Sequence, residues 1–145
     1  MRFQGQWPPG PTGALRPIIS AYTVVSASVL EVTHFLVDSG STRTILSFRT
    51  ADALGLLTLG LPTIPVEGVG GLAERVEVDA RIGLIRETGD AVYVGGPYFA
   101  FTSPDSGTDD ILGNDVIDNF DLILSYRRRE VLLLALPHEA AVVGG

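Results

Sequence analysis

The residues best suited to chemistry lie in the segment Phe35–Ser41, where an apolar run ends at a carboxylate. The run has the composition of a strand, and Asp38 is followed by the turn residues Ser39, Gly40 and Ser41. Gly40 lets the backbone turn tightly and present N–H groups to the carboxylate, and two hydroxyls stand beside it. A carboxylate held in this way can act as a general acid or base. Asp-Ser-Gly is also a common turn sequence, so the tripeptide alone leaves both interpretations open.

Two further segments could build a binding cleft. Residues 67–71 (EGVGG) lie between β-branched runs and predict a hairpin with a glycine-rich tip. The tip comprises Gly68, Val69, Gly70 and Gly71. Ile111 opens an apolar–apolar–glycine run ahead of a segment with helical spacing. The hairpin is either a surface turn or a lid that closes over a ligand, and Ile111 is either core or part of a pocket wall.

Short strands at near-regular spacing dominate the chain and predict an all-β closed barrel or sandwich. The expected strands and hairpin arms are 18–25, 28–37, 64–66, 76–78, 78–85, 91–94, 98–101, 122–125 and 130–136. Ser47 is expected to cap a short helix that ends before Gly55, and a second helix is expected over 114–120. We divide the chain into a flexible arm (1–16) outside the core, one domain (17–137) and a frayed tail (138–145).

The order and spacing of these segments resemble the retropepsin-like aspartic proteases, the retroviral and bacterial single-lobe type. FLVDSGSTRTIL is similar to their catalytic segment, VEGVGGLAERV to their flap, and ILGNDVIDNF to their hydrophobic–hydrophobic–glycine element and following helix. YRRREVLLL resembles the closing hairpin of bacterial members, so the resemblance covers roughly residues 16–136. It implies a closed barrel of short strands with a flap hairpin and one or two short helices.

The resemblance also implies roles for individual residues. Asp38 would be catalytic, Ser39 would hydrogen-bond across a dimer, and the Gly40 N–H would support the carboxylate. Ser41 would donate its hydroxyl proton to the carboxylate, which predicts an acidic pH optimum. Gly68, Val69, Gly70 and Gly71 would form the flap, and Ile111 would line a substrate pocket.

Aspartic proteolysis needs two carboxylates that share one proton around a water, whereas this chain supplies one such aspartate. The other Asp-Xaa-Gly, Asp105-Ser106-Gly107, follows no apolar strand and has no second flap behind it, so we interpret it as a polar loop. The second carboxylate must then come from a second chain, which predicts a C2 homodimer with one Asp38 from each subunit and a peptide or protein substrate.

One position departs from the retroviral pattern. The glycine of the third element is followed there by an arginine that braces the active-site loop, whereas this chain has Asn114, and Arg43 offers a different ionic contact. This departure motivates an alternative function, a dimeric peptide-binding or scaffold module that cleaves poorly. A third possibility is a dimer that processes only its own chain, with residues 1–16 as the target.

Composition excludes several other classes of function. The chain has 145 residues, a net charge of −7, no cysteine and only two histidines, His34 and His138. A cysteine nucleophile and a cysteine-ligated metal are therefore excluded, and we expect no metal, no cofactor and no nucleic-acid partner. The polar, proline-rich start is unlike a signal peptide, and no run approaches the ~20 apolar residues that span a membrane, so we expect a cytoplasmic protein.

Overall fold

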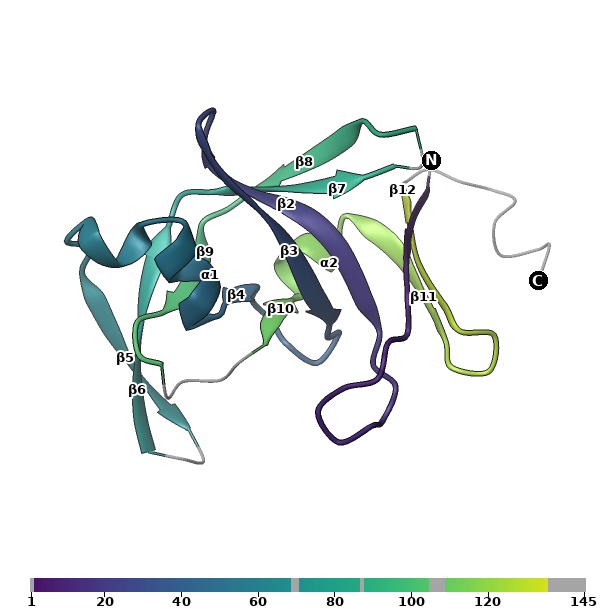
Figure 1. Cartoon of the computed structure of the whole chain (residues 1–145), viewed down its shortest axis with the longest axis horizontal. Coiled ribbons are helices and arrows are strands. Elements are labelled where there is room, and N and C mark those ends of the chain that lie inside the picture. Colours follow the sequence, from purple (N-terminus) through teal and green to yellow (C-terminus); the bar gives the residue numbers. More distant parts are fainter. Residues whose placement is uncertain (1, 69–70, 87, 105–108, 136–145) are drawn as a thin grey trace.

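The fold, described here from a computed structural model, is built almost entirely of short strands (Figure 1). The structure describes residues 2–68, 71–86, 88–104 and 109–135. The strands are β1 (Arg2–Gly5), β2 (Ile18–Ser26), β3 (Val29–Val37), β4 (Ile45–Leu46), β5 (Thr63–Gly68), β6 (Gly71–Val78), β7 (Arg81–Ile85), β8 (Ala91–Gly95), β9 (Tyr98–Phe101), β10 (Asp110–Leu112), β11 (Phe120–Ser125) and β12 (Glu130–Ala135). The helices are α1 (Phe48–Ala53), the 3-10 helix η1 (Leu56–Thr58) and α2 (Asn114–Ile117). The predicted mostly-β fold with short helices is confirmed.

The strands form two hydrogen-bonded sheets. Nine of them follow the order β5-β6-β9-β4-β10-β3-β2-β7-β8, and three follow the order β1-β12-β11. β3 lies between β2, with which it is antiparallel, and β10, with which it runs parallel. This parallel pairing places Leu112 opposite Val37, so the end of β10 lies beside the residue that precedes Asp38.

The prediction of an arm outside the core is wrong for β1 and for Trp7, which follows it. β1 pairs along its whole length with β12, and the Phe3 side chain is 1% exposed with its ring edge-on to Phe120. The Trp7 indole N–H donates to the Glu130 carbonyl. The prolines and glycines that suggested an arm lie mainly after β1, where they shape the turn that leads back to β2.

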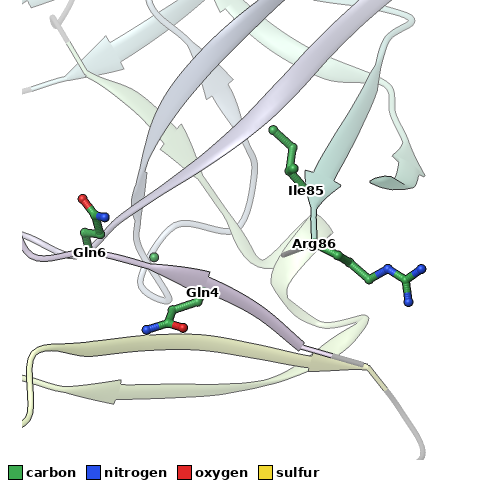
Figure 2. A pocket seen from close by; sticks show the side chains of 5 residues that line it. Gln4, Gln6, Ile85 and Arg86 are labelled. Carbon is green, nitrogen blue, oxygen red and sulfur yellow. The ribbon is translucent and has the colours of Figure 1, made fainter. Parts of the chain in front are cut away.

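A cavity of about 400 Å³ separates β1 from the end of β7 and is lined by Gln4, Gly5, Gln6, Ile85 and Arg86 (Figure 2).

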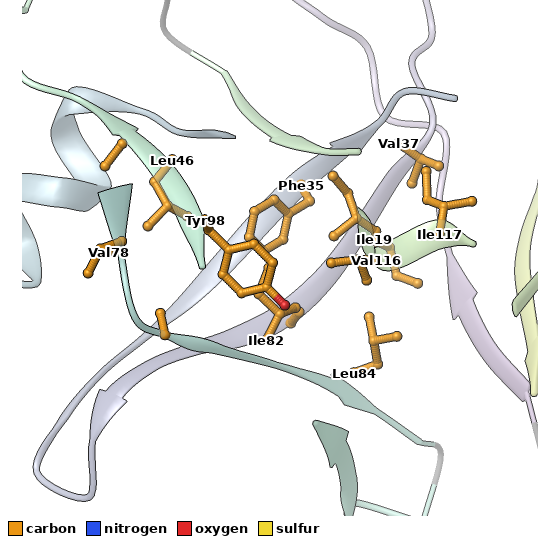
Figure 3. Packing of buried hydrophobic residues seen from close by; sticks show 14 of the residues in the cluster. Ile19, Phe35, Val37, Leu46, Val78, Ile82, Leu84, Tyr98, Val116 and Ile117 are labelled. Atoms are coloured by element: carbon orange, nitrogen blue, oxygen red, sulfur yellow. The ribbon is translucent and has the colours of Figure 1, made fainter. Parts of the chain in front are cut away.

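The core forms between the inward faces of the strands and the short helices. β2 and β3 alternate regularly, so that Ile19, Ala21, Phe35 and Val37 point inward while their neighbours face outward. Figure 3 shows Ile19 and Phe35 packed with residues from β7, β9 and α2, including Ile82, Tyr98 and Val116. This packing fixes β3 along its length and therefore fixes the point at which β3 ends.

Most other element predictions hold, with small shifts at the ends. Ser47 caps α1 by accepting from the Thr50 N–H, and Gly55 follows with φ 71°. The second helix is shorter than expected, because Phe120 turns inward as the first residue of β11. Val78 closes β6 instead of opening the next strand. The predicted tail and the Asp105 loop lie outside the described residues.

Candidate active site

Asp38 lies directly after β3, and its backbone is fixed from both sides. The Val37 N–H donates to the Pro17 carbonyl (2.9 Å), and the Asp38 N–H donates to the Leu112 carbonyl (3.1 Å). The parallel contact between β3 and β10 thus continues to the carboxylate-bearing residue. The side chain is half-buried, as expected for a carboxylate at the mouth of an apolar strand.

Gly40 contacts the carboxylate directly. Its N–H donates to Asp38 Oδ1 at 2.9 Å, and the Ser41 N–H closes the turn by donating to the Asp38 carbonyl (3.1 Å). A Cβ at position 40 would lie 3.1 Å from Oδ1, closer than ordinary van der Waals contact, so glycine permits this approach. The carboxylate therefore accepts a backbone donor, as the sequence predicts.

The predicted contact of Ser41 with the carboxylate is not the one that the structure contains. Ser41 Oγ lies 2.7 Å from the Arg43 carbonyl, which can only accept a hydrogen bond. A hydroxyl has a single proton, so Ser41 cannot also donate to Asp38 in this arrangement. The hydroxyl stabilises the following turn, so the contact from which an acidic pH optimum was predicted is absent from this arrangement. Ser39 is exposed to solvent.

Asn114 braces the loop that carries Asp38. Its side-chain Nδ2 donates to the Ser39 carbonyl (2.8 Å), and its backbone N–H donates to the Ser41 carbonyl (2.8 Å). The two contacts hold the residues on either side of Gly40. An amide thus holds the loop at the position where the retroviral pattern has an arginine.

A second set of contacts fixes the segment that follows the loop. Asp115 accepts the Thr44 N–H with both oxygens (3.0 Å each) and the Thr44 hydroxyl with Oδ1 (2.6 Å). Arg43 Nε lies 3.5 Å from the same carboxylate, which is the ionic contact that the sequence suggested for Arg43. The Thr44 hydroxyl also accepts the Gly113 N–H (3.0 Å), and a Cβ at Gly113 would lie 2.4 Å from the Arg43 carbonyl carbon. A side chain at position 113 would therefore clash with the Arg43 backbone, and glycine allows the loop and α2 to pack this closely.

Sequence reasoning missed Thr44 and Asp115, because 71 residues separate the two partners. It also missed Asp110, whose buried carboxylate accepts the Ser47 N–H (2.7 Å) and the Thr50 hydroxyl (2.9 Å) and so ties α1 to β10. The only available signal is a polar residue beside an apolar run in each case.

Tyr98 is a buried neighbour of this network. Burial and, to a smaller extent, the charge of Asp115 raise the pKa of Tyr98 above its ordinary range. The phenol donates to the Val94 carbonyl.

Ile111 and Leu36 share a face with Asp38. They are paired in register between β10 and β3, and both are partly exposed, whereas their neighbours Leu112 and Val37 are buried. Because side chains alternate along a strand, Leu36 and Asp38 project to the same side of the sheet. A partly apolar wall therefore stands beside the carboxylate.

The predicted glycine-rich hairpin is formed by β5 and β6, which pair from Thr63↔Val76 to Gly68↔Gly71. Val69 and Gly70, two of the four tip residues, lie outside the described residues. β6 is attached to β9 from Val78↔Tyr98 to Arg75↔Phe101, and the Glu74 carbonyl still accepts the Thr102 N–H (3.3 Å). Beyond that point the hairpin continues as two strands.

Four polar side chains outside the Asp38 loop and the hairpin form a separate group. His34 is exposed and its Nδ1 lies 2.7 Å from Ser20 Oγ, while Arg16 pairs with both oxygens of Asp109 (2.9 and 3.1 Å). They line a cavity of about 420 Å³ with Gln4, Gly5, Gln6, Pro8 and Ile18. Within the described ranges, no group of three or more His, Asp or Glu side chains could hold a metal ion, and no helix is long and apolar enough to span a membrane.

Comparison with solved structures identifies the fold. A retropepsin-like aspartic protease from Rickettsia conorii superposes with a TM-score of 0.60 at 13% identity, over 92% of this chain and 98% of that one. EIAV protease complexed with the inhibitor HBY-793 has a TM-score of 0.49 at 17% identity, over 71% and 86%. The retroviral protease-like domain of Ddi1 from Leishmania major has a TM-score of 0.49 at 19% identity, over 83% and 94%.

The fold is therefore that of the retropepsin-like aspartic proteases. The family model for aspartyl proteases matches residues 25–116, well over half of the chain, and the chain belongs to this aspartyl protease family. A comparison with curated proteins finds no match.

Proposed function

We propose that this protein is a homodimeric aspartic endopeptidase whose active site combines Asp38 from two subunits. The observation that carries the proposal is the local environment of the Asp38 carboxylate. Its carboxylate follows a buried strand, accepts the Gly40 N–H, and lies in a loop that Asn114 holds on both sides of that glycine. Such bracing is needed where two loops must meet in a fixed geometry.

Two-fold symmetry completes the site. Each chain has one Asp-Ser-Gly after an apolar strand, and a C2 axis beside Asp38 would bring two copies of that residue face to face. Ser39 is exposed in the single chain, and in the proposed dimer it would contact the partner's loop. The dimer interface would then contain the catalytic loops themselves.

The chemistry follows from a carboxylate pair that shares one proton. The unprotonated carboxylate takes a proton from the water, and the water oxygen adds to the peptide carbonyl carbon while the other carboxylate donates its proton to the carbonyl oxygen. The resulting tetrahedral diol then loses a hydroxyl proton to the carboxylate that had protonated the carbonyl oxygen. The C–N bond breaks as the other carboxyl group gives the leaving nitrogen the proton that it took from water. Each cycle consumes one water and restores the shared proton, without a cofactor or a metal.

The substrate would be an extended peptide or an unfolded protein segment. The β5–β6 hairpin, with Gly68, Val69, Gly70 and Gly71 at its tip, would act as the flap, pair with the peptide backbone and exclude water. Ile111 would contact a substrate side chain on the wall that it shares with Leu36. The alternative of a scaffold module was based on the missing arginine, and Asn114 braces the loop in its place.

The test compares the wild type with Asp38→Asn and with a matched control, Asp105→Asn, which changes the aspartate of the other Asp-Xaa-Gly. Each protein is incubated with denatured casein from pH 3 to 8, and its mass is measured by sedimentation velocity. We expect cleavage by the wild type and the control only, with all three dimeric. Equal cleavage by Asp38→Asn would refute the assignment, and silence of an intact wild-type dimer would favour a scaffold.

A further inference from the structure

Two arginines lie against one phenylalanine ring between the active-site loop and the β5–β6 hairpin. The guanidinium carbon of Arg43 is 4.2 Å from the centroid of the Phe99 ring, and that of Arg75 is 3.8 Å from it. Arg43 follows the Asp38 loop, Arg75 belongs to β6, and Phe99 belongs to β9 between them in the sheet order. We call these three residues the Arg43–Phe99–Arg75 cluster.

The Phe99 ring is buried beneath two arginine side chains. It is 6% exposed, yet it lies outside the contiguous cluster of packed core residues, to which β9 contributes Tyr98 and Ala100. Alternation along β9 turns Phe99 to the opposite face, where Arg43 and Arg75 cover it. A buried aromatic ring outside the core, covered by two cations, indicates a specific contact and not general core packing.

Arg75 also occupies a special position in the hairpin. Its pairing with Phe101 is the last in the β6–β9 register before the hairpin extends toward its tip. The side chain is half-buried, and its Nε is buried without a hydrogen-bond partner in the described part of the chain. Within the described ranges, the side-chain contact observed for this guanidinium is the ring of Phe99. The contact therefore lies close to the point where the hairpin departs from the sheet.

Arg43 connects the other side of the cluster to the active site. Its Nε lies 3.5 Å from Asp115 Oδ2, one terminal nitrogen donates to the Pro97 carbonyl (3.0 Å), and its own carbonyl accepts the Ser41 hydroxyl. The Phe99 N–H donates to the Thr44 carbonyl (3.2 Å). The Asp38 loop, β9 and the hairpin thus meet at one aromatic ring.

We infer that Arg75 is a positioning residue that couples the β5–β6 hairpin to the Asp38 loop through Phe99 and Arg43. This inference rests on the proposed function for its kinetic consequence, but the mechanical coupling does not. Losing the guanidinium would loosen the hairpin at its attachment and weaken substrate capture while leaving Asp38 in place.

The experiment compares Arg75→Met with Arg81→Met. Arg81 makes the same kind of contact, 5.3 Å from the Tyr93 ring, on β7 and β8 at the far end of the sheet. Methionine keeps a long apolar side chain over the ring but removes the charge. We expect Arg75→Met to raise KM for a peptide about 10-fold with kcat changed less than threefold, and Arg75→Lys to recover most of the loss. Arg81→Met should leave KM unchanged.

Amide hydrogen exchange on the free protein gives a second readout that needs no activity. Arg75→Met should speed exchange about 10-fold in β5, β6 and residues 41–44, whereas Arg81→Met should affect β7 and β8 only. If Arg75→Met and Arg81→Met change the exchange rates of the hairpin region and of β7 and β8 to the same extent, the inference is overturned. A wild type that cleaves nothing would refute the proposed function, while the exchange data would still decide the coupling.

Discussion

Replacing Asp115 by asparagine should weaken both the fold and the catalytic loop, because one carboxylate serves several donors. The side chain is 19% exposed, accepts the Thr44 N–H and the Thr44 hydroxyl, and forms an ion pair with Arg43 at 3.5 Å. Asparagine keeps one oxygen and the same shape but removes the charge. Weaker hydrogen bonds to Thr44 cost about 1–2 kcal/mol, and the loss of the half-exposed ion pair adds about 0.5–1 kcal/mol.

The free energy of unfolding of Asp115→Asn should therefore fall by about 1.5–3 kcal/mol, which lowers Tm by roughly 5–12 °C for a chain of this size. Urea unfolding and calorimetry measure the two quantities. The matched control is Asp118→Asn, an exposed aspartate at the end of the same helix, which should change stability by less than about 0.5 kcal/mol. If the two variants unfold within 0.5 kcal/mol of one another, the reasoning about the Asp115 network is refuted.

Three other substitutions test separate parts of the site. Ser41→Ala should leave the acidic limb of the rate–pH profile in place, because the hydroxyl donates to the Arg43 carbonyl. An upward shift of that limb by about one pH unit would show that the Ser41 hydroxyl supports the Asp38 carboxylate. Asn114→Ala should lower kcat about 3- to 10-fold with a small change in Tm, since it removes one contact to the Ser39 carbonyl; unchanged kcat would show that the brace is dispensable. Burial raises the pKa of Tyr98 by penalising its phenolate in the folded state, so the free energy of unfolding falls as pH rises above the ordinary tyrosine value of ~10. Tyr98→Phe removes the hydrogen bond to the Val94 carbonyl and should unfold about 1–2 kcal/mol more easily at pH 7. It should also show a shallower alkaline decline in pH-dependent denaturation, and parallel declines would contradict this sign.

Local patterns account for the parts of the site that the sequence predicts. The apolar run before Asp38 and the glycine after it determine a strand and a tight turn within a few residues, and the structure contains both. The Ser47 cap and the β5–β6 hairpin are equally local, because a hydroxyl at a helix start and a β-branched run each act on their neighbours.

Long-range contacts decided the parts that sequence analysis missed. Proline and glycine between residues 5 and 13 suggested an arm, but Phe3 had a hydrophobic site available between β12 and β11, and burial outweighed the local preference. The Ser41 hydroxyl could reach either Asp38 or Arg43, and composition does not distinguish two acceptors at similar sequence distance. The Thr44–Asp115 contact exists only because β10 returns beside β3.

The central claim is that one active site needs Asp38 from two chains, and a subunit-mixing experiment tests it most directly. Wild-type and Asp38→Asn chains are unfolded, mixed in varying ratio, refolded together and assayed on a peptide. If a dimer shares its two aspartates, activity follows the square of the wild-type fraction, so an equal mixture retains about a quarter of full activity. An equal mixture that retains about half of full activity would show that each chain acts alone and would contradict the claim.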